Sequence, residues 1–461
     1  LDKVDNTGTI TTLNNENAAT LDEIHNQQGG EITNLSNAVQ STITTLTNEG
    51  KIDDGSNAGT ITTFNNSNVN PNNPDSGHLL NFTNQNGGTI TTFDNQGGQV
   101  DALTNAQGGT INSFTNQAQG NVGNLTNAGS LTNLNNVNGT MNAITNTGTI
   151  QTGTNTGSIT TLTNNANGRI NSFTNDQQGS IQNLNNTGGH FESLTNNNTI
   201  TAITNTSTFK DVINNDTITT FTNQTNGSVE NLSNTNTATL TTLSNEANAT
   251  ITTLTNQGNI TNAFSNAGRV TTLQNDNGTF NAGITNTNTG TITTLTNNGT
   301  ITNGITNEAQ GNNRGNIGTI NNQQNLSSIT NAGDINTINN QSNATLTTLT
   351  NQTGGSIQTL NNTQNSTITT LTNQANATIG QFDNAGSVTN AFTNNGTITT
   401  LNNNNTGSFT QGITNAGTGT ITTLTNNGTI NVGITNQANG NIGTLTNTSQ
   451  LDKVDNSGRT T

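Results

Sequence analysis

Cysteine is absent from the sequence, which excludes disulfides, thiolate metal sites and a cysteine nucleophile. Tryptophan and tyrosine are absent too, and proline occurs only 2 times. No stretch approaches the roughly 20 apolar residues that a membrane-spanning helix requires. The chain opens at Leu1 without a charged and then apolar signal segment, so we expect it to be a piece of a longer precursor.

Charge is also scarce. Charged residues make up 7% of the chain, and 24 acidic against 8 basic residues give a net charge of -16. A surface of this sign does not attract nucleic acid or an anionic membrane, so we expect no nucleic-acid partner and no membrane insertion. A cysteine-free, acidic composition rich in Asn, Thr and Gly is typical of exported bacterial or archaeal surface proteins. The expected location is therefore extracellular or at the cell surface.

What the chain does contain is one short unit, seen most simply as Thr42-Ile-Thr-Thr-Leu-Thr-Asn48. Its general form is Gly or Ala, Thr or Ser, Ile, two small polar residues, Leu or Phe, a polar residue, Asn, and a short turn back to Gly. A period near ten residues is too short for two-helix repeats and lacks a 3.6-residue spacing. The first apolar residues of the opening units are spaced by 11, 11, 11, 9 and 9 residues, at Ile10, Leu21, Ile32, Ile43, Ile52 and Ile61.

This unit predicts an all-β fold, a parallel β-solenoid (β-helix) built from 9–11-residue strand-turn units. Thr and Ile favour extended backbone, whereas Gly and Asn tolerate the conformations that corners require. Stacked units would pair strand on strand at about 4.8 Å. We favour two units, about 20 residues, per coil. Three units per coil stays open, because 12 units separate Ile218 from Leu346 and 13 separate Ile90 from Ile218.

Each position of the unit has a predicted role. The two apolar residues should form core columns, and the final Asn should form an internal ladder whose amides donate and accept along the stack. The predicted core residues are Ile43, Leu46, Ile218, Phe221, Leu240, Leu243, Ile251 and Leu254. The predicted ladder residues are Asn48, Asn223, Asn234, Asn245, Asn256, Asn266 and Asn394.

The units are grouped into larger repeats, near residues 90–217, 218–345 and 346–450. Even irregular members are copied: in Ile260-Thr-Asn-Ala-Phe264 and Val388-Thr-Asn-Ala-Phe392 the second apolar residue comes one place later. The opening Leu-Asp-Lys-Val-Asp-Asn recurs 450 residues on, so residues 451–461 read as the start of the next repeat. We expect one continuous solenoid over 1–461. The residues expected to carry end-to-end continuity are Leu1, Val4, Asn6, Leu451, Val454 and Asn456.

Two segments interrupt the rhythm. Residues 65–80 hold both prolines, Pro71 and Pro74, and should form a loop that protrudes from the repeat body. Residues 311–316, with Arg314, form a smaller insertion. Either segment could be a contact site or a tolerated insertion on the solenoid surface.

Catalytic and metal-binding patterns are missing. His25, His78 and His190 are far apart and have no metal-ligand spacing. Asp22-Glu23 and Asp53-Asp54 could bind Ca²⁺ or simply face solvent, and the Gly pairs lack the calcium-binding nonapeptide pattern. The abundant hydroxyls have no associated base. We therefore expect no enzyme activity, no cofactor and no metal.

The Asn-Gly-Thr-Ile units at Asn298–Ile301, Asn395–Ile398 and Asn427–Ile430 give the chain a family resemblance. It resembles the parallel β-helix passengers of bacterial surface proteins: autotransporter and vacuolating-cytotoxin-like adhesins and filamentous-haemagglutinin-like exoproteins. The resemblance implies export to the cell surface, a rigid stalk and adhesion. It brings no catalytic residues.

Two functions follow. The first is structural: an extracellular fibre, stalk or adhesin shaft that continues head to tail, with itself as partner through repeats of the same chain or identical subunits, and with host or neighbouring cell surfaces as further partners. The second is an ice-binding or carbohydrate-binding module that uses flat threonine ladders. In the unit described above, the candidates for that outer surface are Thr42, Thr44, Thr45 and Thr47.

Overall fold

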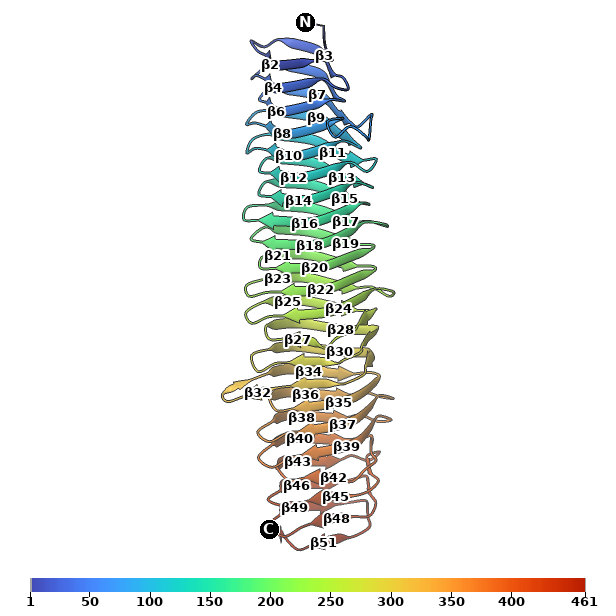
Figure 1. Ribbon diagram of the computed structural model, residues 1–461. Helices are drawn as coiled ribbons and strands as arrows, with labels where there is room; N and C mark the ends of the chain where they lie inside the picture. The colour runs from blue at the N-terminus through green and yellow to red at the C-terminus, as the bar shows by residue number, and fades with distance from the viewer. Residues whose placement is uncertain (1, 461) are drawn as a thin grey trace. The chain divides into compact units, whose positions relative to one another are not determined.

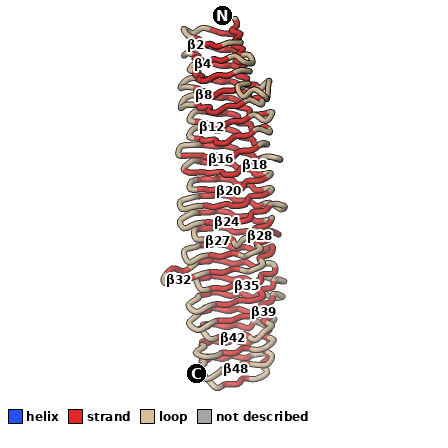
Figure 2. The backbone as a smooth tube through the Cα atoms, in the orientation of Figure 1, coloured by secondary structure: helices blue, strands red, loops and turns tan. Residues whose placement is uncertain are grey.

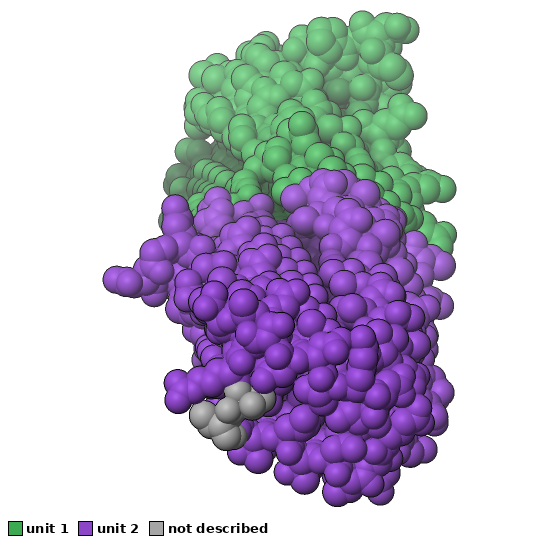
Figure 3. All heavy atoms as spheres, turned by 90° about the horizontal axis from the view of Figure 1, so that it is seen from below, with its two compact units in different colours: residues 1–221 green, residues 222–461 purple. Residues whose placement is uncertain are grey.

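The computed structural model describes residues 2–460, and every regular element in that range is a β-strand (Figure 1). The chain divides into two compact units, residues 1–221 and 222–461, which Figure 3 shows in separate colours. In each unit the strands form two stacks, and each coil contributes a strand segment to both.

In unit 1 the odd-numbered strands form the first stack and the even-numbered strands the second. The first stack contains β1 (Lys3–Asn6), β3 (Thr20–Asn26), β5 (Thr42–Asn48), β7 (Thr60–Ser67), β9 (Thr89–Gln96), β11 (Thr110–Gln117), β13 (Ser130–Val137), β15 (Thr149–Asn155), β17 (Arg169–Asn175), β19 (His190–Asn196) and β21 (Thr208–Asn214). The second contains β2 (Thr9–Asn15), β4 (Glu31–Asn37), β6 (Lys51–Asn57), β8 (His78–Asn84), β10 (Gln99–Asn105), β12 (Asn121–Asn127), β14 (Thr140–Asn146), β16 (Ser158–Asn165), β18 (Ser180–Thr187) and β20 (Thr199–Asn205), and β22 (Thr217–Asn223) follows in the chain.

Unit 2 repeats this arrangement, although several rungs of its second stack are split into two short strands. Its first stack contains β23 (Ser228–Asn234), β25 (Thr250–Asn256), β28 (Arg269–Phe280), β30 (Thr291–Ile301), β34 (Asn316–Asn322), β36 (Asp334–Asn340), β38 (Ser356–Asn362), β40 (Thr378–Asn384), β43 (Thr397–Asn403), β46 (Thr420–Asn426), β49 (Asn441–Asn447) and β52 (Arg459–Thr460). Its second contains β24 (Thr239–Asn245), β26 (Asn259–Ile260), β27 (Phe264–Asn266), β29 (Ile284–Asn286), β31 (Ile305–Asn307), β35 (Asn325–Asn331), β37 (Thr345–Asn351), β39 (Thr367–Asn373), β41 (Ser387–Val388), β42 (Phe392–Asn394), β44 (Ser408–Phe409), β45 (Ile413–Asn415), β47 (Thr429–Ile430), β48 (Ile434–Asn436), β50 (Gln450–Leu451) and β51 (Val454–Asn456). The ends of β28 and β30 turn the corner and also pair in the second stack.

Pairing within each stack is parallel, and equivalent residues lie opposite one another. Ile43 of β5 pairs with Leu21 of β3 and Ile61 of β7, and Leu46 pairs with Ile24 and Phe64. One coil spans 22 residues from Asn26 to Asn48 and 18 residues from Asn48 to Asn66. The predicted all-β parallel solenoid is therefore confirmed, with two units per coil and not three.

The strand itself departs from simple alternation. In β5 the second, fifth and seventh residues are buried, so both residues between Ile43 and Leu46 face outward. Thr44 has no partner in the register between β5 and its neighbours, whereas Thr45 pairs with Thr63. The strand bends at this position, which explains why the two core residues of a unit are three apart.

Backbone geometry explains the Gly and Asn positions of the motif. A Cβ added to Gly50 would lie 2.2 Å from the carbonyl oxygen of Gly30 and 2.5 Å from that of Gln27, so only glycine fits against the preceding coil there. Longer turns place Asn in the left-handed region, as at Asn226 (φ 69°) and Asn248 (φ 63°). Turn length therefore varies without disturbing the register of the strands.

The bounds of the two predicted insertions, 65–80 and 311–316, differ from those the sequence suggests: the first is shorter, and the second begins and ends two residues earlier. Residues 68–77 form the loop between β7 and β8, because Asn66 and Leu79 are fully buried in regular unit positions on either side. The smaller insertion is an antiparallel hairpin, β32 (Ala309–Gln310) and β33 (Asn313–Arg314), which projects from unit 2 (Figure 1). Asn316 already belongs to β34.

Candidate functional surface

The asparagine that ends each unit lies inside the coil. Asn48 is fully buried, and its Nδ2 donates to Asn66 Oδ1 at 2.8 Å and to the His78 carbonyl oxygen at 3.3 Å. In every such pair, the amide nitrogen of the earlier coil donates to the amide oxygen of the later one. The other predicted ladder residues are fully buried and donate in the same way at 2.8–3.0 Å: Asn223, Asn234, Asn245, Asn256, Asn266 and Asn394.

The predicted core residues face inward and are inaccessible to solvent. Leucine and isoleucine side chains buried to this extent contribute about 1.5–3 kcal/mol each relative to exposure. They are structural and cannot contact a ligand. All are 0% exposed: Ile43, Leu46, Ile218, Phe221, Leu240, Leu243, Ile251 and Leu254.

The two copies of the opening hexapeptide take the same positions of the repeat unit, the first in the first stack of unit 1 and the second in the second stack of unit 2. Val4 pairs with Ile24 and Asn6 with Asn26 of the following coil. Val454 pairs with Ile434 and Asn456 with Asn436 of the preceding coil. Leu451 pairs with Ile430, while Leu1 lies outside the described residues. The same sequence is thus seen pairing with a coil that follows it and with a coil that precedes it.

Threonines form regular columns on the outer surface. In β5, Thr44 is exposed and Thr42, Thr45 and Thr47 are half-buried. The longest unbroken column lies in the second stack of unit 2, one threonine per rung and about 4.8 Å apart. Its members pair in order: Thr285, Thr306, Thr330, Thr350, Thr372, Thr393, Thr414 and Thr435.

The strand face that carries this column has no charge, a feature that inspection of single units missed. We call it the neutral stack. In contrast, the first stack of the same unit carries Glu230, Arg269, Asp334 and Asp383 in its strands. Reading alternate units separately would have found the difference in the sequence. The neutral stack, which contains no Asp, Glu, Lys, Arg or His, comprises residues 239–245, 259–266, 279–286, 300–307, 325–331, 345–351, 367–373, 387–394, 408–415 and 429–436.

Six rungs of the neutral stack carry an extra residue between their two core positions. They form two groups of three, here called the first bulge run (residues 260–305) and the second bulge run (residues 388–434). Ile260 and Phe264 both remain 0% exposed, so the added residue must loop outward. In Figure 2 loop segments replace strand at such sites, for example beside β27 and β42.

Charged side chains gather mainly in unit 1 and form ion pairs across neighbouring coils. Lys3 Nζ lies 3.2 Å from Asp5 and 3.3 Å from Glu23. Glu192 accepts hydrogen bonds from Lys210 and His190, which lower its pKa to about 2, and Arg169 adds a further attraction. These clusters link successive coils.

The three histidines lie far apart, each beside a carboxylate. His25 Nε2 lies 3.1 Å from Glu49, and His78 Nε2 lies 3.1 Å from Asp101. His190 belongs to the Glu192 cluster. Among residues 2–460, no group of three His, Cys, Asp or Glu side chains could hold a metal ion.

The acidic pairs considered for Ca²⁺ have protein partners. Asp53 pairs with Lys51 at 2.7 Å, and Asp54 accepts a hydrogen bond from Asn81 Nδ2 at 3.1 Å. Glu23 pairs with Lys3. Asp22 and Asp54 are exposed, and Glu23 and Asp53 are half-buried.

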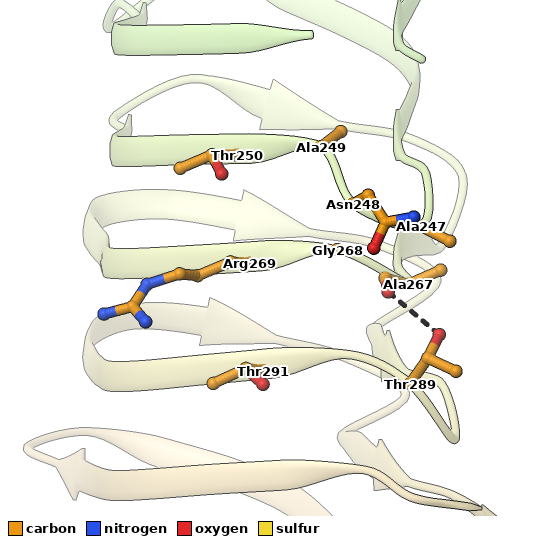
Figure 4. Close-up of a pocket in the computed structure, with 9 residues that line it drawn as sticks. All are labelled: Ala247, Asn248, Ala249, Thr250, Ala267, Gly268, Arg269, Thr289 and Thr291. Atoms are coloured by element: carbon orange, nitrogen blue, oxygen red, sulfur yellow. Dashed lines mark hydrogen bonds between the residues drawn. The ribbon is translucent and has the colours of Figure 1, made fainter. Parts of the chain in front are cut away.

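Shallow hollows occur where a short turn lies between longer ones. The hollow in Figure 4 has a volume of about 370 Å³, with the short turn at Ala267–Gly268 set between Ala247–Asn248 and Thr289. Thr289 Oγ1 donates to the Ala267 carbonyl oxygen at 2.9 Å, and Arg269 extends away from the turn. Arg269 is the one ionisable side chain in the lining, and the hollow arises from the difference in length between neighbouring turns.

Aromatic side chains do not form a sugar-stacking surface on this chain. Each of the 13 phenylalanines is buried at a core position, and some stack on each other there, as Phe93 does on Phe114. Carbohydrate recognition by stacking on exposed rings therefore has no support among these residues.

Over residues 2–460 no helix is long and apolar enough to cross a membrane. Searches against protein families and against curated proteins find no match to this chain.

Proposed function

We propose that this protein is structural and forms a length of an extracellular fibre, stalk or adhesin shaft, as one continuous solenoid over residues 1–461 that continues head to tail. The observation that supports this best is the register of the repeated hexapeptide. Val4 and Val454 take the same core position of the unit, and Asn6 and Asn456 the same ladder position, although β1 belongs to the first stack and β51 to the second. A coil built from this sequence can therefore join the coil at Ile434–Asn436 to the coil at Glu23–Asn26 without a change of register.

The internal ladder adds a second argument for a structural role. Each buried amide is satisfied by the coils before and after it, so the coil can be repeated without limit and without burying an unpaired polar group. Over residues 2–460 the outer surface presents mainly small hydroxyl and amide side chains, and its clustered charged side chains form ion pairs and not an arrangement of acid, base and nucleophile. We infer that the protein is not an enzyme and that its partners are itself and cell surfaces.

The location belongs to the same proposal. A surface position, export from a bacterial or archaeal cell and adhesion rest on the composition and on the resemblance to β-helix passengers. Continuity could be covalent, through further repeats of the same chain, or could come from stacking of identical subunits.

Electron microscopy of the purified protein over a concentration series tests the proposal. We expect filaments or end-joined rods with a regular axial repeat, and a chain carrying the 450-residue segment twice should give a proportionally longer rod. Val4→Arg should weaken joining by stacking, whereas Val39→Arg, in an exposed turn, should not. Rods of one length at every concentration, together with a tandem chain that does not lengthen, would contradict the proposal.

A second candidate is ordering of water or ice by the threonine column of the neutral stack. Eight threonines in strict register favour it, and the bulge runs beside the column argue against a flat face. Measurement of thermal hysteresis tests this directly. Activity that survives Thr350→Lys, in the middle of the column, would rule out this surface.

A further inference from the structure

The neutral stack differs from the rest of a chain whose net charge is -16. Its outward residues are Thr, Ser, Asn, Gln, Ala, Gly and a single Val. Two copies that each carry this net charge repel one another overall, and the neutral stack adds no charge of its own to that repulsion. Charge therefore leaves the neutral stack open to close contact with an identical chain, as far as the next rung, where Asp455 follows Thr435 in the column.

The side chains of this face suit packing against another sheet. Threonine is small and β-branched, and the column from Thr285 to Thr435 repeats it in register. Sheets with identical, uncharged, in-register side chains pack face to face at about 10 Å, with dry, interdigitated contacts. The amides and hydroxyls of this surface can form hydrogen bonds with the same groups on the partner.

Backbone hydrogen bonds hold the outward bulges of this face in place. In the first bulge run Phe264 N donates to Gly283 O at 3.1 Å and Ile284 N to Gly304 O at 3.0 Å. In the second, Ile413 N donates to Gly433 O at 3.1 Å. Gly283 has a φ of 83°, and a Cβ there would lie 2.5 Å from Gly304 O, so the sequence specifies the bulges. Each run is a rigid ridge three rungs long.

One residue on the second ridge is apolar, exposed and strained. Val432 is 53% exposed and has a φ of 63°, a conformation that β-branched residues rarely adopt. Its backbone nitrogen is held by Asp452 Oδ2 at 2.8 Å. Backbone strain of this kind persists where the surroundings impose it and is frequent at binding surfaces.

Between the two ridges lie three regular rungs, β35, β37 and β39, which form a recess of the same length as each ridge. We propose that the neutral stack is the contact surface for a second copy of this chain, packed with a ridge of each copy in the recess of the other. A two-fold axis relates the copies, as in most homodimers, because the ridge and recess make one patch self-complementary. Val432 and its neighbours on the ridge meet Thr348 and Thr350 in the recess.

The size of the face is sufficient. Strands of about seven residues at about 3.3 Å each span about 23 Å, and the six rungs that overlap in this arrangement, one ridge and the recess, span about 29 Å at about 4.8 Å per rung. The overlap measures about 670 Å², so contact would bury about 1,300 Å² over both copies. Stable interfaces bury about 1,200–2,000 Å². This lateral contact goes beyond the proposed end-to-end continuity and does not depend on it.

Sedimentation velocity over a concentration series tests the proposal. We expect a monomer–dimer equilibrium that Thr348→Lys weakens at least tenfold. Thr359→Lys is the matched control, because Thr359 holds the same position of the unit on the opposite stack and is equally half-buried. Val432→Asp should also weaken the dimer without unfolding the chain, since Asp tolerates a positive φ better than Val. Val69→Asp, in the 68–77 loop, should have no effect.

Each other outcome overturns the proposal. The proposal is wrong if the chain stays monomeric at every concentration. It is also wrong if Thr348→Lys and Thr359→Lys weaken the dimer equally. Binding of the monomer to cellulose, lost in Thr348→Lys but not in Thr359→Lys, would assign the face to a neutral glycan instead. Val4→Arg separates the two proposals, because it should disturb end-to-end joining and leave the lateral dimer intact.

Discussion

At the scale of single residues, the ladder asparagine is the position with the least freedom. Its Nδ2 donates to the next ladder amide and to backbone carbonyl oxygens, and its Oδ1 accepts from the preceding coil. Asn394, for example, donates to Asn415 Oδ1, Gly396 O and Thr420 O and accepts from Asn373. No other side chain of this size offers both groups in this geometry. The core positions, in contrast, accept Ile, Leu, Val, Phe and Met.

We predict that Asn394→Ala lowers the free energy of unfolding by about 2 kcal/mol or more, because Asn373 Nδ2 loses one of its acceptors and the buried Asn415 Oδ1 loses its Asn394 donor. Asn395→Ala is the matched control, since Asn395 is adjacent and only half-buried. Urea unfolding and amide exchange around residue 394 would measure the difference. Equal effects of the two variants would argue against the ladder as a stabilising element.

Glu192 gives a prediction about pH. Its pKa is lowered from 4.5 to about 2 by Lys210 and His190, so the folded state favours the charged carboxylate more than the unfolded state does. The contribution of Glu192 to stability is therefore complete above pH 4.5 and is lost as the pH falls towards 2. Glu192→Gln should lower the melting temperature slightly at pH 7 and not at pH 2, because the site is exposed to solvent. A difference between variant and parent that is independent of pH would contradict this assignment.

At the scale of elements, the strands are uniform, and the variation lies in what joins them. Turns differ in length, one loop and one hairpin are inserted, and six rungs carry a bulge. Each variation begins and ends at a buried position of the unit, so the stacks continue through it. The fold therefore tolerates insertion at corners and not inside strands.

Deletion of the hairpin residues 311–314 tests this tolerance. The deletion converts Glu308-Ala-Gln-Gly-Asn-Asn-Arg-Gly-Asn-Ile317 into a turn of the same length as Gln437-Ala-Asn-Gly-Asn-Ile442. We expect a folded chain with nearly unchanged strand content by circular dichroism, and a modest loss of stability because Arg314 no longer bonds Asp334. Deletion of residues 437–440 is the control and should unfold the local coils, because it removes an entire turn. If both deletions unfolded the chain equally, the conclusion that the fold tolerates changes of length at its corners would be wrong.

The sequence predicts much of this fold because one unit carries all the local information. In Thr42–Asn48 the β-branched residues, the spacing of Ile43 and Leu46 and the terminal Asn48 are enough to predict strand, core and ladder. The number of units per coil needed the structure, because unit counts between larger repeats do not define closure. The neutral stack was missed because its lack of charge appears only when alternate units are compared with one another. The bounds of the 68–77 loop were missed because Asn66 and Leu79 can be assigned to regular unit positions only once their burial is known.

At the scale of the molecule, the few charged residues are distributed unevenly over the repeated fold. A chain of 461 residues with 8 basic and 24 acidic residues keeps its charge on selected faces and leaves the neutral stack free of it. The ends of the repeat and this face would then serve different contacts, one along the solenoid and one across it. Fibres built from such chains would lengthen through one contact and bundle through the other.

The uniform direction of the asparagine ladder has one more consequence. Each ladder amide donates to the amide of the next coil towards the C-terminus, as from Asn6 to Asn26 and from Asn436 to Asn456, so the ladder has a direction. Its N-terminal end presents an amide carbonyl oxygen, and its C-terminal end presents an amide N–H. Two N-terminal ends or two C-terminal ends cannot continue the ladder of hydrogen bonds, so chains that join through it must all point the same way. A fibre made from this coil would have two chemically distinct ends, and growth at one would differ in rate from growth at the other.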